Sequence, residues 1–192
     1  MDYLVYQISS LSASAEERSA MLPPEEQAEA SRRGGAYGAI RLQLRLELSR
    51  RTRIPPDRVE LTYNDYGKPD CMHQPFNISH SGDCLCMAFH HKSIGVDVER
   101  IRTRSYEALA TRFMSKPQLE GFRQRGCRQE EFFACWCAAE ALVKHAGDTM
   151  WHALQYPFHF AHDRIICDFP NAPEVQLFQP MPGYCGAVAY SI

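Results

Sequence analysis

The sequence predicts an α+β protein made of two related halves, residues 1–100 and 101–192, that meet near residue 100. Helical and strand-like patterns occur in both halves instead of being confined to one of them. In each half a long helical pattern precedes a short apolar strand, and the last strand, "YCGAVAYSI", faintly echoes "CLCMAFHH" of the first half. This repeated order favours two halves with a common layout.

Four elements are expected early in the chain. The run "YLVYQI", residues 3–8, predicts a strand, and Ser14 followed by Glu17 forms a capping box that predicts a short helix. The stretch "PPEEQAEASRR" predicts a second helix, because prolines and acids stand at its front and arginines at its back. The stretch "GGAYGAIRLQLRLELSRR" predicts a third helix, although its leucines at every second position also fit a strand.

The rest of the first half predicts short strands. Residues 59–63 predict one strand, and "YNDYGKP" follows it with an Asn-Asp turn. The segment "FNISHSGDCLCMAFHHKSIGVDVE", residues 76–99, predicts a loop, then a strand at 83–89, a turn, and a second strand at 93–99.

The second half predicts helices followed by strands. Short helices are expected near 105–113 and 116–124. The stretch "QEEFFACWCAAEALVKHAG" predicts a long helix, with acids at its start, lysine and histidine near its end, and Gly147 as its C-cap. Short strands are then expected near 155–161, 164–168, 174–179 and 183–191.

Composition narrows the class of protein. The 192-residue chain has a formal charge of −2, which argues against a general nucleic-acid or membrane-surface binder. The first residues, "MDYLVYQISS", lack the basic start and apolar stretch of a signal peptide, and no run reaches the roughly 18 apolar residues of a membrane helix. We therefore expect a cytoplasmic protein with no nucleic-acid or membrane partner, and two fused halves favour a monomer.

The chain contains eight cysteines, which are expected to be reduced thiols in the cytoplasm. No C-x-x-C spacing occurs, so a zinc site of the usual pattern is unsupported. The pairs Cys84 with Cys86 and Cys135 with Cys137 stand among apolar residues, where a free cysteine behaves as a small hydrophobe. Packing is the favoured interpretation, and a metal or redox role stays open.

Two carboxylates interrupt the apolar run "SIGVDVER". Asp97 and Glu99 stand two positions apart and therefore point to the same face of the predicted strand. Two negative charges on one face repel each other and resist burial, which indicates a cation between them. The alternative is a strand edge that faces solvent.

A third carboxylate stands on the long helix. Phe132, Trp136, Glu140 and Lys144 follow at four-residue steps and share one ridge of the helix. Because Phe132 and Trp136 face the core, Glu140 is drawn toward the buried side. Three oxygen ligands suit Mg²⁺, which commonly shares its site with phosphates. The alternative is a simple pair between Glu140 and Lys144.

Two further segments carry groups that bind phosphate. In "YGKP", Gly67 permits close approach of the backbone beside Lys68, a point charge with three donors. In "FNISHSG", Ser79, His80 and Ser81 stand ahead of a strand and could donate to an anion. The alternative for His80 is an ordinary structural histidine.

The ordered motifs "YGKP", "FNISHSG", "IGVDVE" and W-x-x-x-E-x-x-x-K resemble those of the Sfp-type 4′-phosphopantetheinyl transferases, over about residues 60–150. The resemblance implies the 4′-phosphopantetheinyl transferase fold, a pseudo-dimer of two similar α+β halves with the active site in the cleft between them. It also implies transfer of the phosphopantetheine arm of coenzyme A to a serine of an acyl or peptidyl carrier protein, with release of adenosine 3′,5′-bisphosphate.

The same resemblance implies roles for particular residues. Asp97, Glu99 and Glu140 would hold Mg²⁺ on the pyrophosphate of coenzyme A, and Lys144 would contact that pyrophosphate. Glu140 would also accept the proton of the serine hydroxyl, either directly or through a metal-bound water. The coenzyme A contacts would come from Gly67, Lys68 and Pro69 along the nucleotide, and from Ser79, His80 and Ser81 near phosphate.

The segment 100–128 carries eight basic residues against two acidic ones. Carrier proteins of this family's reaction are typically acidic along the docking helix, so a basic flank beside the cleft would steer them. The alternative is a solvated surface that happens to be rich in arginine.

The sequence departs from the family pattern at two places. Ala139 stands where the long helix of the family usually carries lysine, and the usual basic residues of the N-terminal region are missing, although Arg32, Arg33, Arg41 or Arg45 could replace them. One alternative is therefore a weakened or inactive relative that binds coenzyme A or a carrier protein. A second is an unrelated Mg²⁺-dependent phosphohydrolase.

Overall fold

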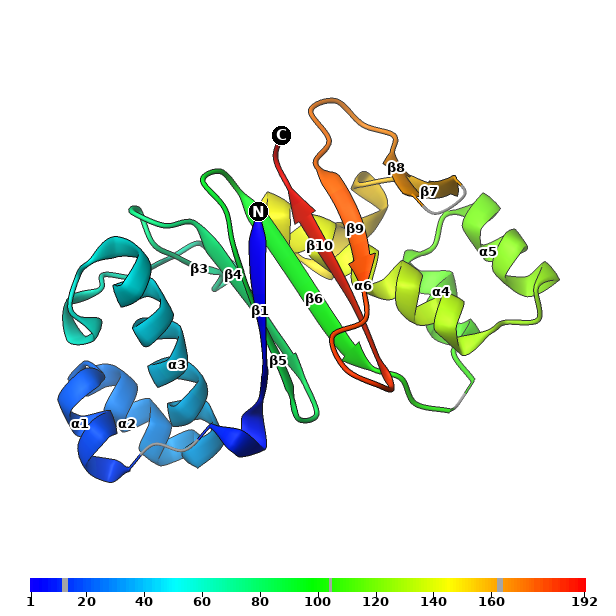
Figure 1. The fold of residues 1–192 in the computed structure, drawn as a ribbon. Helices are drawn as coiled ribbons and strands as arrows, with labels where there is room; N and C mark the ends of the chain where they lie inside the picture. Colours follow the sequence, from blue (N-terminus) through cyan, green and yellow to red (C-terminus); the bar gives the residue numbers. More distant parts are fainter. Residues whose placement is uncertain (12–13, 104, 162–163) are drawn as a thin grey trace.

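The computed structural model describes residues 1–11, 14–103, 105–161 and 164–192. It is an α+β protein, as predicted, in which strands form the middle of the molecule and helices lie on either side (Figure 1). The layers follow the order α3, a three-stranded sheet, a five-stranded sheet, and α6.

The N-terminal part contains the three-stranded sheet, in the order β1-β5-β4 and antiparallel throughout. The predicted first strand and the three helices are confirmed, and Ser14 and Glu17 make both hydrogen bonds of the capping box, at 2.7 and 3.0 Å. The elements are β1 (Asp2–Gln7), the 3₁₀ helix η1 (Ile8–Ser10), α1 (Ala15–Met21), α2 (Pro24–Arg33), α3 (Gly35–Thr52), the 3₁₀ helix η2 (Pro56–Arg58), β2 (Thr62–Tyr63), β3 (Pro69–Asp70), β4 (Phe76–Ser81) and β5 (Cys84–Phe89).

The C-terminal part contains the five-stranded sheet, in the order β6-β10-β9-β8-β7. The helices and strands predicted for this part are confirmed, with boundaries shifted by a few residues, and the 3₁₀ helix η3 was not predicted. The elements are β6 (Ile94–Arg100), α4 (Glu107–Phe113), α5 (Lys116–Gln124), α6 (Gln129–Ala146), η3 (Met150–Gln155), β7 (Phe158–Ala161), β8 (Arg164–Cys167), β9 (Glu174–Phe178) and β10 (Tyr184–Tyr190).

Strand β6 joins the C-terminal sheet by its backbone hydrogen bonds, because it pairs with β10 in antiparallel register. The sequence had placed this strand in the N-terminal half, and its local pattern contains nothing that reveals a partner some ninety residues further along. Division of the chain near residue 100 stays a prediction.

Strand β4 corrects one expectation, since the segment "FNISHS" was predicted as a loop. It forms a strand that pairs with β5, with Ser79 opposite Cys86. Asparagine and serine are typical of loops because their side chains compete for backbone hydrogen bonds. Here the side chains of alternate residues instead bond to the neighbouring strand β6, which leaves the backbone free to pair with β5.

Strand β5 is buried on both faces and separates two cores. Leu85 and Phe89 pack against Leu44 and Leu48 of α3, so the leucine-rich segment 35–52 is a helix and its alternative as a strand is wrong. Cys84, Cys86 and Ala88 face the other way, and pack against β6 and β10. This alternation follows from the period of two in a strand.

Helix α6 covers the other side of the five-stranded sheet and lies behind β6 and β10 in Figure 1. Phe132 stacks on Tyr106 and contacts Trp136, and Gly147 ends the helix in the left-handed conformation, at φ 72°. Ala139 is 3% exposed inside this core. A lysine at that position would have to carry its ammonium group out of an apolar layer.

Gly95 lets α6 approach β6 closely. A Cβ atom on this residue would lie 2.1 Å from the carbonyl oxygen of Ala141 and 2.3 Å from the amide nitrogen of His145. Both atoms belong to the helix backbone, so no side-chain rotation relieves the overlap. The glycine of "IGVDVE" therefore sets the distance between the strand and the helix.

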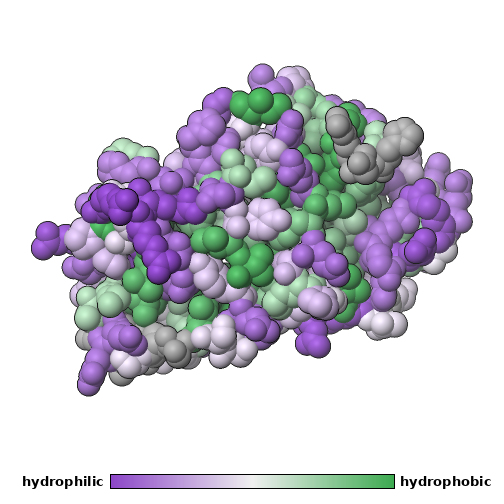
Figure 2. Space-filling view, in the orientation of Figure 1, coloured by the Kyte–Doolittle hydropathy of each residue, from purple (hydrophilic) through white to green (hydrophobic). Residues whose placement is uncertain are grey.

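The surface and the thiols have few unusual features. Hydrophilic residues cover the two outer ends of the molecule, and hydrophobic residues show mainly across the middle (Figure 2). All eight cysteines are free, and five of them are buried. Across the described residues, no helix combines the length and apolar character that crossing a bilayer requires.

Candidate active site

Asp97 is the most deeply buried acid of the predicted site, at 3% exposure. Its Oδ1 accepts hydrogen bonds from Ser79 Oγ at 2.8 Å and from Lys144 Nζ at 2.7 Å. Its Oδ2 is buried and has no hydrogen-bond partner among the described residues. A buried carboxylate oxygen without a partner carries a large desolvation penalty, so it is suited to accept a further ligand.

Glu99 lies on the same face of β6, two residues further on. Its Oε2 accepts a hydrogen bond from Ser81 Oγ at 2.7 Å. Burial, helped by the charge of Asp97, raises the pKa of Glu99 against the opposing hydrogen bond of Ser81. The raised pKa indicates a carboxylate that lacks sufficient positive charge nearby.

Glu140 projects from α6 toward the same two carboxylates. Burial raises its pKa to about 7, with Asp97 and Glu99 adding to the rise and Lys144 opposing it. The Nζ of Lys144 lies 3.9 Å from Oε2 of Glu140. A carboxylate that titrates near neutral pH is suited to accept and release a proton.

Lys144 is the cation of this group. Besides Asp97 and Glu140, its Nζ contacts Ser79 Oγ at 3.2 Å. Burial lowers its pKa, but the two carboxylates outweigh burial and raise the pKa above the usual value. The structure therefore brings the four predicted residues Asp97, Glu99, Glu140 and Lys144 near one another, and Lys144 contacts two of the three carboxylates, those of Asp97 and Glu140.

These residues fit a divalent cation by their chemistry. When all four side chains are charged, two negative charges stay uncompensated, and the buried Oδ2 of Asp97 lacks a partner. Hard oxygen ligands of this kind suit Mg²⁺. The three carboxylates do not converge on one point in this structure. Within the described ranges, no three Asp, Glu, His or Cys side chains lie at metal-binding distances.

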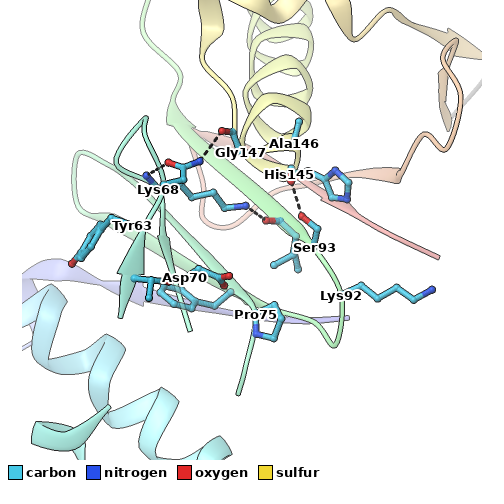
Figure 3. A pocket seen from close by; sticks show the side chains of 13 residues that line it. Tyr63, Lys68, Asp70, Pro75, Lys92, Ser93, His145, Ala146 and Gly147 are labelled. Atoms are coloured by element: carbon cyan, nitrogen blue, oxygen red, sulfur yellow. Dashed lines mark hydrogen bonds between the residues drawn. The ribbon is translucent and has the colours of Figure 1, made fainter. Parts of the chain in front are cut away.

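A cavity of about 460 Å³ opens at the C-terminal end of α6, between the loop 62–70 of the N-terminal part and the turn before β6 (Figure 3). Lys68 reaches into it and donates from Nζ to the carbonyl of Ile94 at 3.1 Å. Burial lowers the pKa of Lys68, and Asp70 opposes this. The predicted contact residue Lys68 thus lines a cavity formed by both parts of the chain.

The other predicted coenzyme A contacts lie in different settings. Gly67 forms the turn before Lys68 at φ 79°, and Pro69 begins β3. Ser79 and Ser81 bond to the two carboxylates, whereas His80 between them is exposed and points to the opposite face of β4. Contact between these residues and phosphate stays a prediction.

The four arginines considered as replacements for the usual N-terminal cations all have carboxylate partners. Arg41 and Arg45 are buried and pair with Glu26, the latter at 2.8 Å. Arg32 and Arg33 pair with Glu29 on the surface of α2. These ion pairs leave the arginines with less free charge for a phosphate group than the sequence alone suggests.

The basic segment 100–128 lies beside Glu99. Arg100 and Arg102 line a small cavity of about 200 Å³ together with Glu99 and Trp136. Part of the positive charge further along is neutralised, since Arg123 pairs with Glu107 at 2.8 Å and Arg125 pairs with Glu131. Arg104 lies outside the described residues.

Asn64, which was not among the predicted site residues, joins the turn before β3 to the end of α6. Its Nδ2 donates to the carbonyl of Gly147 at 2.7 Å, and its Oδ1 accepts the amide of Lys68 at 2.9 Å. One asparagine therefore orders the turn that carries Lys68 and fixes it to the end of α6. The Asn-Asp turn was visible in the sequence, but its distant partner was not.

We expect His145 to make the protein less stable in mild acid. Burial, with Lys68 and His90 nearby, lowers the pKa of His145 from 6.5 to about 4. The unfolded chain then binds the proton more readily, so the stabilisation is complete above pH 6.5 and falls as the pH drops toward 4. After allowance for partial exposure, wild type should lose about 1–2 kcal/mol more between pH 7 and pH 5 than His145→Gln does.

Urea unfolding at the two pH values measures this difference. His73→Gln, which changes an exposed histidine, is the control and should behave like wild type. Equal losses in wild type and His145→Gln would contradict the assignment.

The fold and the site together define an α+β protein whose carboxylate–lysine group suits cation-assisted chemistry on phosphate esters. Residues 93–185 match the sequence profile of the 4′-phosphopantetheinyl transferase superfamily. The matched stretch is just under half of the chain, which is similar to this superfamily there.

Three curated relatives show the extent of the similarity. 4′-Phosphopantetheinyl transferase Sfp of Bacillus subtilis is 29% identical over 76% of this chain and 69% of its own length. A putative 4′-phosphopantetheinyl transferase of Haemophilus influenzae is 31% identical over 58% of this chain and 50% of its own. 4′-Phosphopantetheinyl transferase HetI of Nostoc is 34% identical over 50% and 44%. The chain thus spans about half the length of the last two.

Proposed function

We propose that this protein transfers the 4′-phosphopantetheine arm of coenzyme A to a serine of an acyl or peptidyl carrier protein. The observation that carries the proposal is the partly buried group of Asp97, Glu99, Glu140 and Lys144, in which the buried Oδ2 of Asp97 has no hydrogen-bond partner among the described residues. Transfer of a phosphoryl-linked group needs charge neutralisation and alignment more than covalent help from the protein. This group can supply both.

Asp97, Glu99 and Glu140 would hold Mg²⁺, whose charge when bound neutralises part of the pyrophosphate of coenzyme A. Lys144 would add a second positive charge beside the pyrophosphate, because its Nζ lies 2.7 Å from Asp97 Oδ1. The nucleotide end would occupy the cavity beside Lys68, with Gly67 and Pro69 shaping the turn.

Glu140 acts on the carrier's serine hydroxyl. As the serine oxygen forms its bond to the β-phosphorus, the bond between that phosphorus and the bridging oxygen breaks, and adenosine 3′,5′-bisphosphate leaves. The hydroxyl proton passes to a carboxylate oxygen of Glu140, which projects from α6 toward Asp97 and Glu99.

The partner is a carrier protein with an acidic docking helix. Arg100 and Arg102 stand next to Glu99, so the basic segment 100–128 borders the proposed site and would steer an acidic partner into it. The enzyme would work as a monomer, because both parts of one chain line the cavity. The free thiols accord with a cytoplasmic protein, and neither nucleic acid nor a membrane takes part.

Intact-mass spectrometry tests the proposal. The protein is incubated with coenzyme A, Mg²⁺ and a panel of apo carrier proteins from fatty-acid, polyketide and peptide synthesis. At least one carrier should gain the mass of the phosphopantetheine arm, and a chelator should prevent the gain. If no carrier gains mass, the protein is not a transferase.

We expect Lys68→Ala to raise the KM for coenzyme A about tenfold and to change kcat little, because it removes one charge-assisted contact in the binding cavity. Steady-state kinetics with varied coenzyme A measures this. Arg58→Ala, which removes an exposed positive charge from the same part of the chain, is the control. An unchanged KM in Lys68→Ala would remove Lys68 from the binding site.

One set of observations favours a second candidate, a weakened relative that binds coenzyme A or a carrier without efficient transfer. The arginines that could contact phosphate are paired with Glu26 and Glu29, and Ala139 is buried. Calorimetric binding of coenzyme A without any mass gain on the carrier panel would support this candidate against the transferase.

A further inference from the structure

Strands β4 and β6 run side by side and in the same direction. The hydrogen bonds between them are made by side chains of β4 and not by its backbone. Three β4 side chains accept hydrogen bonds from the β6 backbone, each from a residue nineteen positions further along. The bonds join Val96 N to Asn77 Oδ1 at 2.8 Å, Val98 N to Ser79 Oγ at 3.3 Å, and Arg100 N to Ser81 Oγ at 3.1 Å.

The hydroxyl groups of Ser79 and Ser81 also bond to two carboxylates of β6. Ser79 Oγ donates its proton to Asp97 at 2.8 Å, and Ser81 Oγ donates to Glu99 at 2.7 Å. The same arrangement of hydrogen bonds therefore occurs twice. Each hydroxyl accepts one β6 amide and donates to the carboxylate of the residue just before that amide.

These hydrogen bonds determine what the two serine hydroxyls can still bind. A hydroxyl has one donor and two acceptor lone pairs. Ser79 uses all three, since Lys144 Nζ is its second donor partner at 3.2 Å. Ser81 has one lone pair left, and its only proton is committed to Glu99. Neither serine retains a proton to donate to a phosphate oxygen.

We propose that Ser79 and Ser81 are positioning residues, which fix the carboxylates of Asp97 and Glu99 in the orientation that a divalent cation requires. The inference rests on the proposed function. A carboxylate tied both to a hydroxyl and, through it, to its own strand has few accessible rotamers. Such outer hydrogen bonds commonly tune metal affinity by 10- to 100-fold.

Ser81→Ala tests the inference through Mg²⁺ affinity, measured by calorimetry on protein saturated with coenzyme A and without a carrier protein. We expect the affinity to fall about tenfold, and Ser81→Thr to restore it. Ser81→Cys keeps the volume but is a weak donor, so it should show the same loss if Ser81→Ala does not fold. Asn77→Ala is the matched control, because it breaks a strand contact that involves no carboxylate.

Each result is decisive. A Ser81→Ala affinity within twofold of wild type would overturn the inference, and so would an equal loss in Asn77→Ala, since the effect would then belong to the strand contact. Wild-type protein that binds no Mg²⁺ in the presence of coenzyme A would instead overturn the proposed cation site, and with it the proposed function.

Discussion

Gly95→Ala is expected to lower the free energy of unfolding by more than about 3 kcal/mol. The added methyl group would lie 2.1 Å from the carbonyl oxygen of Ala141, and this oxygen cannot move unless α6 moves. Displacement of α6 carries Glu140 and Lys144 away from Asp97, because all three depend on the spacing between helix and strand. The variant should therefore lose activity as well as stability.

Urea unfolding at neutral pH measures the change in stability. Gly35→Ala is the control, since a Cβ there meets no atom within 4 Å and the residue begins a helix. The control should keep wild-type stability or gain slightly, because alanine favours a helix more than glycine does. A Gly95→Ala protein as stable as wild type would show that the helix does not lie this close to β6.

Glu140→Gln is expected to reduce the transfer rate by about 10²- to 10⁴-fold. The amide can neither accept the serine proton nor provide a charged ligand for a cation. Burial already disfavours the ionised form of Glu140, as its pKa of about 7 indicates, so the neutral glutamine should not lower the stability of the fold. Loss of rate without loss of stability separates a role in catalysis from a role in folding.

Steady-state kinetics and thermal unfolding together test this expectation. Glu130→Gln changes an exposed acid of the same helix and is the matched control, with wild-type rate and stability. If Glu140→Gln kept the parental rate, Glu140 would be neither the proton acceptor nor a ligand that transfer requires.

Much of the fold could be predicted because its signals are local. The acids, aromatic ridge and terminal glycine of α6 are all present in one stretch, and the capping box of Ser14 and Glu17 defines the start of α1. The pairing of β6 with β10 could not be predicted, since the two strands lie far apart in the chain. Strand β4 was missed because its polar residues form bonds that only the tertiary structure provides.

The candidate site was predicted in outline for a similar reason. The period of two in β6 aligns Asp97 with Glu99, and the period of four in α6 aligns Glu140 with Lys144. Which atoms meet depends on the crossing at Gly95, and this is a tertiary property. The alternation of small polar residues at 77, 79 and 81 was a signal for the bonds to β6, and it was visible in the sequence.

The hydrogen bonds that hold β4 to β6 also hold two carboxylates of the candidate site. A continuous backbone ladder would hold these strands together whatever their side chains did. Here, separating the strands breaks three side-chain bonds, each worth about 1 kcal/mol, and two of these also anchor a carboxylate. Separation of the strands along this line would therefore also release the carboxylates of Asp97 and Glu99 from the serines that hold them.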